Sequence, residues 1–224
     1  MFSALLFLSL FALVGGKSKF LIFILGLFFL GISTSRTALI SFLIAVFLIL
    51  CSNIILKNKF IYLFIFIFIA LMSFLNIYIM IFSDLSYYNE VVLQYTGKNL
   101  LSGRNEIWQF LIPYIQQKPL LGWGGGVNID DISYFSYSAH NAYIQYIIQV
   151  GLLGLSFIFL FFGLIWMYII DNKNIYSRYC LGFVFWIFFV QNFEITFLQN
   201  NIALSLPILI LLSYFLGKDA KIRL

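Results

Sequence analysis

The sequence predicts an all-α integral membrane protein, a polytopic bundle of about seven helical segments with one long loop outside the membrane. Two observations predict this fold class. First, 63% of the 224 residues are hydrophobic and only 9% are charged, and the mean hydropathy is +1.03, whereas a soluble domain is roughly half apolar. Second, the apolar residues form continuous runs such as residues 60–71, unlike the alternating segments of a transmembrane barrel. Continuous runs indicate helices, because lipid offers the backbone no hydrogen-bond partners.

Seven apolar runs are expected to form the helices of this bundle. They cover residues 2–14, 20–32, 37–56, 60–82, 142–170, 179–198 and 202–216. A crossing needs about 20 apolar residues, so two of the runs are short. No internal repeat and no Pro- or Ser-rich linker divides the chain, and we expect a single membrane domain over residues 1–224.

The first run differs from an ordinary start because no basic residue precedes it. A signal peptide would carry a positively charged beginning and a cleavage site between small residues, and neither is convincing in this sequence. We therefore expect that the chain begins inside a longer protein whose first helices are missing.

The positions of lysine and arginine predict the orientation, because cytoplasmic loops retain basic residues. Alternate connections between the runs hold Lys17, Lys19, Lys57, Lys59, Lys173, Arg178, Lys218, Lys221 and Arg223. The opposite side includes the long loop of residues 83–141 and yet holds only Arg36, Lys98, Arg104 and Lys118. We expect a multi-pass protein whose long loop faces outward. The net charge of +5 is mostly this topological signal and does not indicate nucleic acid.

The long loop is predicted to contain a helix over residues 103–117 that lies at the membrane interface. Apolar side chains share one stripe and polar side chains the other face. The stripe holds Trp108, Leu111, Ile112 and Ile115, and the polar face Asn105, Glu106, Gln109, Gln116 and Gln117. Lys118-Pro119 ends this helix, and the glycines of residues 120–126 predict an irregular turn. Trp123 in that turn is a candidate to stack on a sugar ring or to anchor in the headgroups.

Two arginines on the outer side are candidates to bind an anion. Arg36 joins two apolar runs, and Arg104 begins the interfacial helix, where unpaired N–H groups and the helix dipole also attract anions. A guanidinium offers a planar fork of donors that matches phosphate oxygens. The alternatives are that Arg36 snorkels to lipid phosphates and that Arg104 is only an exposed cation.

His140 is the only histidine of the chain, and histidine is the side chain best suited to exchange protons near neutral pH. It precedes the run of residues 142–170 and lies between Ser138 and Asn141, which are both good helix caps. One interpretation is that it only belongs to this capping region. The other is catalytic, because arginines can stabilise a leaving phosphate while a neutral histidine takes the proton from an attacking hydroxyl.

The acidic residues and cysteines are weaker candidates. Glu194 lies inside or near the outer end of the run 179–198, where a carboxylate needs a partner or water. It is a candidate to orient an arginine or the acceptor, and the alternative is that it is protonated or only interfacial. Adjacent Asp130 and Asp131 are expected to be solvated. Cys51 and Cys180 are expected to pack and not to form a disulfide. No set of residues has the spacing of a metal site, so we expect neither metal nor cofactor.

Several short motifs, in this order and spacing, resemble the shared catalytic region of bacterial O-antigen ligases and polysaccharide polymerases. They are Ser35-Arg36, Ser102-Gly103-Arg104 with Trp108, Pro119-Leu-Leu-Gly-Trp-Gly124, His140-Asn141-Ala-Tyr143 and Gly151-Leu-Leu-Gly154. The resemblance covers roughly residues 31–160. It implies that the fold is similar to that of C-type glycosyltransferases and that the protein lies in the bacterial cytoplasmic membrane. It also implies that the chain is part of a longer family domain.

The same resemblance implies a reaction and roles for the site residues. The donor is an undecaprenyl-diphosphate-linked glycan, used without nucleotide sugar and without metal. Arg36 and Arg104 match the arginines that contact the diphosphate, and His140 matches the general base. The acceptor is a glycan in a polymerase or a lipid in a ligase, and we slightly favour the polymerase. Glu194, Trp123 and Asn141 are supporting candidates, and membrane lipids and other polysaccharide-export proteins are expected partners.

Two further hypotheses belong to other classes. In a transporter or flippase, the arginines bind the anionic lipid and His140 relays protons. Transporters place such groups near the membrane midplane on paired repeats, whereas the three residues here are expected on the outer side of a chain without repeats. The other hypothesis is an inactive, truncated remnant, and it rests on the unusual first run.

Overall fold

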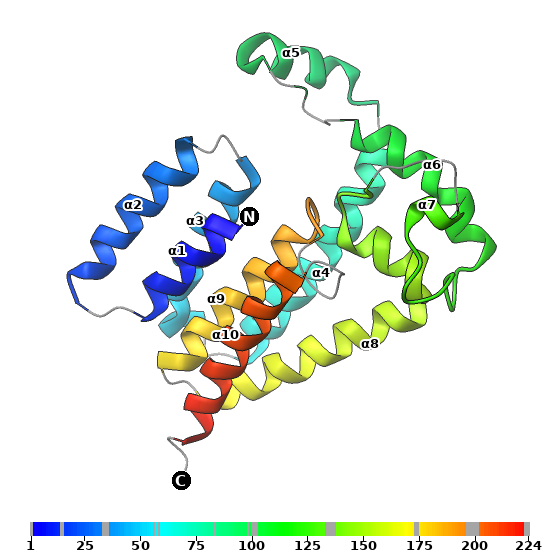
Figure 1. Cartoon of the computed structure of the whole chain (residues 1–224). Helices are drawn as coiled ribbons and strands as arrows, with labels where there is room; N and C mark the ends of the chain where they lie inside the picture. Colours follow the sequence, from blue (N-terminus) through cyan, green and yellow to red (C-terminus); the bar gives the residue numbers. More distant parts are fainter. Residues whose placement is uncertain are drawn as a thin grey trace. The chain divides into compact units, whose positions relative to one another are not determined.

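The computed structural model describes residues 2–13, 16–32, 36–55, 57, 59–82, 84–97, 99, 103–132, 138–172, 175–195 and 202–221. Within these ranges the secondary structure is helical, without strands (Figure 1). The helices in chain order are α1 (Phe2–Leu13), α2 (Ser18–Ile32), α3 (Arg36–Ile55), α4 (Lys59–Phe82), α5 (Ser86–Thr96), α6 (Arg104–Gln117), α7 (Ile129–Ile132), α8 (Ala142–Asn172), α9 (Ile175–Val190) and α10 (Ile202–Lys221).

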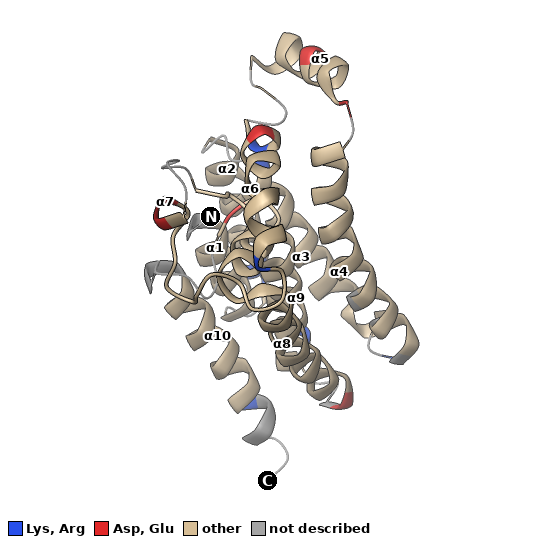
Figure 2. Cartoon of the chain, turned by 90° about the vertical axis from the view of Figure 1, so that its right-hand side faces the viewer, with Lys and Arg blue, Asp and Glu red and all other residues tan. Residues whose placement is uncertain are grey.

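The predicted apolar runs correspond to α1 to α4 and α8 to α10, but the run 179–198 is displaced relative to α9. Among the described residues, three helical segments are long and apolar enough to cross a membrane by length and composition, namely Arg36–Ile55, Leu63–Phe82 and Ala142–Asp171. The remaining apolar helices are shorter, so a crossing by all seven segments stays a prediction. Figure 2 shows that the long helices carry charged residues only toward their ends, and their middles are uncharged.

The chain divides into two compact units. Unit 1 contains residues 1–69 and 161–224, and unit 2 contains residues 70–160. In unit 1, α3 packs most extensively on α9. Gly182 of α9 permits this approach, because a Cβ atom there would lie only 2.5 Å from the Ile49 side chain. The core of this unit contains the fully buried Phe42, Phe183 and Trp186.

Unit 2 contains the second half of α4, the helices α5, α6 and α7, and the first part of α8. The predicted helix over residues 103–117 is present as α6, with Trp108 and Leu111 fully buried. The sequence did not predict α5. This helix starts beside Asp84, whose carboxylate accepts a hydrogen bond of 3.0 Å from the Ser86 N–H. It ends at Gly97, which has φ +66 and donates to Leu93 O at 2.9 Å.

The prediction of one continuous helix over residues 142–170 was wrong, because α8 breaks at Gly151. Its φ of 67° and ψ of −173° lie in a region that is essentially restricted to glycine. The rings of Tyr143 and Phe159 stack with centroids 5.9 Å apart, although a straight helix would separate these residues by about 24 Å. The bend therefore turns the two arms of α8 toward each other.

Candidate functional site

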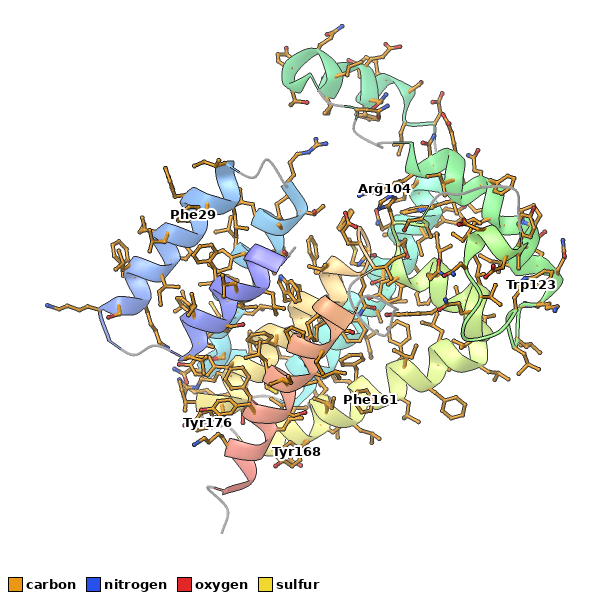
Figure 3. All side chains as sticks on the ribbon, in the orientation of Figure 1. Phe29, Arg104, Trp123, Phe161, Tyr168 and Tyr176 are labelled. Carbon is orange, nitrogen blue, oxygen red and sulfur yellow. The ribbon has the colours of Figure 1, made fainter. Side chains whose placement is uncertain are left out.

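The helix that begins with Arg104 is joined directly to the segment that carries His140. Trp108 lies one helical turn after Arg104 and is fully buried. Its indole N–H donates a hydrogen bond of 2.7 Å to the carbonyl oxygen of Ala139, the residue before His140. Arg104 and His140 therefore belong to one hydrogen-bonded part of unit 2. Figure 3 shows Arg104 at the start of α6.

His140 itself adopts an uncommon backbone conformation. Its φ is +46°, and among the described residues it is the only non-glycine residue with positive φ. Such a conformation costs about 1–3 kcal/mol and persists only where the surroundings impose it. Here Ala139 is held by Trp108 on one side, and the His140 N–H donates to Ser138 Oγ at 3.3 Å. The side chain of His140 is exposed.

Asn141 fixes the chain on the other side of His140. Its side chain is fully buried, and its Oδ1 atom accepts hydrogen bonds from the N–H groups of Tyr143 at 2.9 Å and Ile144 at 3.1 Å. Asn141 is therefore the N-cap of α8, because these N–H groups have no partner within the helix. Asn141 thereby holds the chain that directly follows His140.

The glycine-rich turn predicted after α6 interlocks with the break in α8. Backbone hydrogen bonds connect the two segments: Trp123 N to Ile148 O at 2.7 Å, Gly124 N to Gln149 O at 2.9 Å, Leu152 N to Pro119 O at 2.9 Å and Leu153 N to Leu120 O at 3.2 Å. A Cβ atom at Gly151 would lie 2.1 Å from Leu120 O, and one at Gly122 would lie 2.6 Å from the backbone of Gln149. Glycine is therefore required on both sides of this junction.

Trp123 has structural contacts at the far end of α6. Its indole N–H donates to Tyr114 O at 3.0 Å, one of the last carbonyl groups of the helix, and Lys118 Nζ lies 4.1 Å from its ring centroid. Because Tyr114 follows Arg104 by ten residues, the two positions are about 15 Å apart along the helix. Figure 3 shows Trp123 well away from Arg104. Its stacking on a sugar stays a prediction.

Arg36 and Glu194 belong to unit 1. Arg36 is exposed and is the first residue of α3, and Glu194 lies in the turn that follows α9, where its N–H donates to Val190 O at 2.9 Å. Figure 1 shows α3 and α9 running in opposite directions, so both residues lie at the same end of unit 1.

The prediction of an apolar helix over residues 179–198 was wrong at both ends, since α9 covers Ile175–Val190. Asn192 terminates it, because its side-chain amide donates to Phe188 O at 3.1 Å and to Phe189 O at 3.3 Å. These contacts satisfy carbonyl groups that the helix end leaves without partners. Residues 196–198 lie outside the described residues, as do Ser35, Lys98 and Ser102.

Gln191 is a candidate that sequence reasoning did not single out. It lies directly after α9, is only 2% exposed, and its Nε2 atom has no hydrogen-bond partner among the described residues. A buried donor without a partner costs about 1–3 kcal/mol. The signal in the sequence is an amide pair, Gln191-Asn192, within an otherwise apolar segment. We therefore add Gln191 to the candidates at this end of unit 1.

The acidic residues of the loop have local roles. Asp130 and Asp131 lie in the short helix α7, and Asp131 Oδ2 accepts from Asn128 N at 2.8 Å. Within the described ranges, no three side chains of the types His, Cys, Asp and Glu gather at one place. Independence from metal stays a prediction.

Comparison with known proteins gives one match. A family model described as O-antigen ligase matches residues 21–159, which is more than half of the chain. No curated protein and no solved structure matches the chain. The matched range includes the start of α6, the glycine turn, His140 and the break in α8. Proteins of this family are glycosyltransferase-like membrane enzymes that act on lipid-linked glycans. The chain therefore belongs to the O-antigen ligase family.

Proposed function

We propose that this protein transfers a glycan from undecaprenyl diphosphate to an acceptor at the outer face of the bacterial cytoplasmic membrane. The acceptor hydroxyl oxygen attacks the anomeric carbon of the donor sugar, and its proton passes to His140. The bond between the anomeric carbon and the diphosphate oxygen breaks, and its electron pair leaves with undecaprenyl diphosphate. Attack from the opposite face inverts the anomeric carbon.

The proposed roles follow the chemistry of the side chains. Arg104 binds the diphosphate at the start of α6, where the N–H groups of the first turn add to the positive field. Arg36 contributes a second guanidinium, because charge develops on the diphosphate as it leaves. His140 is the base. Glu194 is proposed to orient an arginine or the acceptor, and the reaction needs no metal.

One observation carries this proposal: the hydrogen bond of 2.7 Å from Trp108 to Ala139 O. It holds the helix that begins with Arg104 against the segment that carries His140. The proposed reaction needs a diphosphate-binding group and a base near the same anomeric carbon, and this contact supports that arrangement. The buried N-cap Asn141 supports it, because it fixes the chain on the other side of His140.

The distribution of charge supports the proposed orientation. In unit 1 the α1–α2 connection, the end of α3, the start of α9 and the end of α10 lie at one end (Figure 1). Lys19 Nζ hydrogen-bonds the Tyr179 hydroxyl at this end, and most of the lysines of the chain occur in these segments. Arg36 and Glu194 lie at the opposite end. We propose that the basic end faces the cytoplasm and that both units belong to one membrane domain.

The test is to replace His140 by Ala in the host cell and to analyse both the surface glycan and the undecaprenyl-linked intermediates. For a polymerase, which we slightly favour, we expect loss of long glycan while single repeat units still reach the surface. For a ligase we expect long glycan to accumulate on the lipid carrier. Gln116→Ala is the matched control, because Gln116 is an exposed residue at the other end of α6.

Three results would oppose the proposal. An unchanged glycan profile in the His140→Ala strain would contradict the role of His140 as the base. Lipid-linked units that stay on the cytoplasmic face would favour the flippase instead. Equal activity of Arg104→Lys and the wild type would contradict bidentate binding of the diphosphate, because lysine keeps the charge but lacks the planar fork of donors.

A further inference from the structure

Unit 2 contains a cavity of about 470 Å³ at the end of α4, beside the starts of α5 and α6. Its volume falls within the roughly 300–1,000 Å³ of small-molecule sites. Six of the described lining residues carry a carboxylate or a carboxamide, and the others include one aromatic ring and three apolar side chains. Those used below are Phe82, Asp84, Asn89, Asn99, Asn105 and Glu106.

Hydrogen bonds hold the helices that form the wall of this cavity. Gln109 of α6 donates from Nε2 to Ile81 O of α4 at 2.8 Å, which joins α6 to a carbonyl group at the end of α4. Asp84 accepts from the Ser86 N–H at 3.0 Å and so holds the start of α5. The cavity therefore has a largely formed shape, which is typical of binding sites for small molecules.

The wall has the chemistry of a carbohydrate site. Sugar hydroxyl groups both donate and accept hydrogen bonds; carboxylates accept them, and carboxamides do both. Phe82 is 67% exposed, and its ring packs against Tyr78 with centroids 5.0 Å apart. The electron-rich face of such a ring attracts the partly positive C–H groups of a sugar.

The charge of the wall selects among sugars. Asp84 and Glu106 contribute carboxylates, and the described lining contains neither lysine nor arginine. A cleft lined by one sign of charge repels ligands of the same sign. The cavity therefore disfavours uronic and other acidic sugars and favours neutral or amino sugars.

Its position adjoins the proposed diphosphate site, since Gly103 and Asn105 both line it and flank Arg104 in the chain. We propose that this cavity binds sugar rings of the lipid-linked glycan while Arg104 binds the diphosphate, and that it selects neutral or amino sugars. This inference rests on the proposed function and adds to it a glycan subsite and a substrate class.

The test measures binding by the full chain in lipid nanodiscs. The probes are undecaprenyl diphosphate alone, the same carrier with a neutral oligosaccharide, and the carrier with an oligosaccharide of equal length that contains a uronic acid. The wild type is expected to bind the neutral glycan-bearing carrier most tightly. Phe82→Ala removes the ring that packs on the sugar, and Glu106→Gln removes the charge of a hydrogen-bond acceptor. Each is expected to weaken that binding about tenfold and to leave binding of the bare carrier unchanged.

Two variants separate the possible outcomes. Glu90→Gln is the matched control for Glu106→Gln, because Glu90 is exposed on α5 and outside the cavity lining, and it should change neither affinity. Arg104→Ala should weaken binding of every carrier. Equal binding of bare and glycosylated carriers by the wild type, or of neutral and acidic glycans, would contradict the subsite alone. A wild type that binds no carrier would contradict the proposed function and the subsite together.

Discussion

Replacement of Gly151 by alanine tests how the break in α8 is built. The backbone conformation of Gly151 is essentially restricted to glycine and should cost an alanine about 1–3 kcal/mol. The added Cβ atom would also lie 2.1 Å from Leu120 O, so the glycine turn must move away. That movement breaks the hydrogen bonds from Leu152 N to Pro119 O and from Leu153 N to Leu120 O, each with a net value of about 0.5–1.5 kcal/mol.

The sum predicts a loss of about 2–6 kcal/mol in the free energy of unfolding, which places Gly151→Ala among the severe substitutions. For a chain of this size the midpoint of thermal unfolding should fall on the order of 10 °C. Thermal unfolding in detergent micelles, followed by tryptophan fluorescence, measures this shift, and Trp123 in the displaced turn gives a local signal.

Gly126→Ala is the matched control. Gly126 lies in the same loop, and a Cβ atom there would meet no other atom within 4 Å. Its substitution should change stability by less than about 0.5 kcal/mol. If Gly151→Ala unfolds at the same temperature as Gly126→Ala, the interlocked junction described above is wrong.

Three further predictions concern single contacts. Trp108→Phe should destabilise the chain by about 1–3 kcal/mol more than Trp186→Phe. Both tryptophans are fully buried, but the indole N–H of Trp108 donates a hydrogen bond whereas that of Trp186 has no partner among the described residues; equal unfolding midpoints would refute this. Asn141→Ala should cost about 1 kcal/mol through the lost N-cap and speed hydrogen exchange of the two amides that it caps, and unchanged exchange would contradict the cap. Hydrogen bonds from the Ser86 backbone and side chain lower the pKa of Asp84. The backbone amides at the start of α5 should therefore be protected from hydrogen exchange at pH values above the pKa of an unfolded aspartate, about 3.9. That protection should disappear as the pH falls through the lowered value, and hydrogen exchange at the first turn of α5 measures it; protection that persists at the lowest pH would refute the contact.

Composition alone predicted most of the helices, because in lipid a continuous apolar run has few alternatives to a helix. The helix α6 was predicted from the spacing of Trp108 and Leu111, which are indeed buried. The helix α5 has no buried residue, and its Tyr87 and Tyr95 are exposed. Its Tyr88, Val91, Val92 and Tyr95 recur at helical spacing, but none of them is buried, and this helix was not predicted from the sequence.

The break in α8 escaped prediction for a different reason. A glycine inside an apolar run is compatible with a straight helix, and the conformation of Gly151 depends on a turn about 30 residues earlier in the chain. The same limit applies to Trp108, whose partner Ala139 is 31 residues away. The sequence correctly predicted that His140 lies next to a helix cap. It could not show that Trp108 holds the segment that carries His140, through the carbonyl oxygen of Ala139. The sequence makes Trp123 a candidate to stack on a sugar ring or to anchor in the headgroups, and its contact with Tyr114 depends on the folded turn.

The most direct test of the central claim supplies the purified chain in nanodiscs with a glycosylated carrier and an acceptor glycan, and measures the release of undecaprenyl diphosphate. The account predicts that His140→Ala lowers the rate at least about 100-fold, the usual contribution of a general base, while binding of the carrier is retained. Gln116→Ala should release the carrier at the wild-type rate. Equal rates for His140→Ala and the wild type would contradict the account.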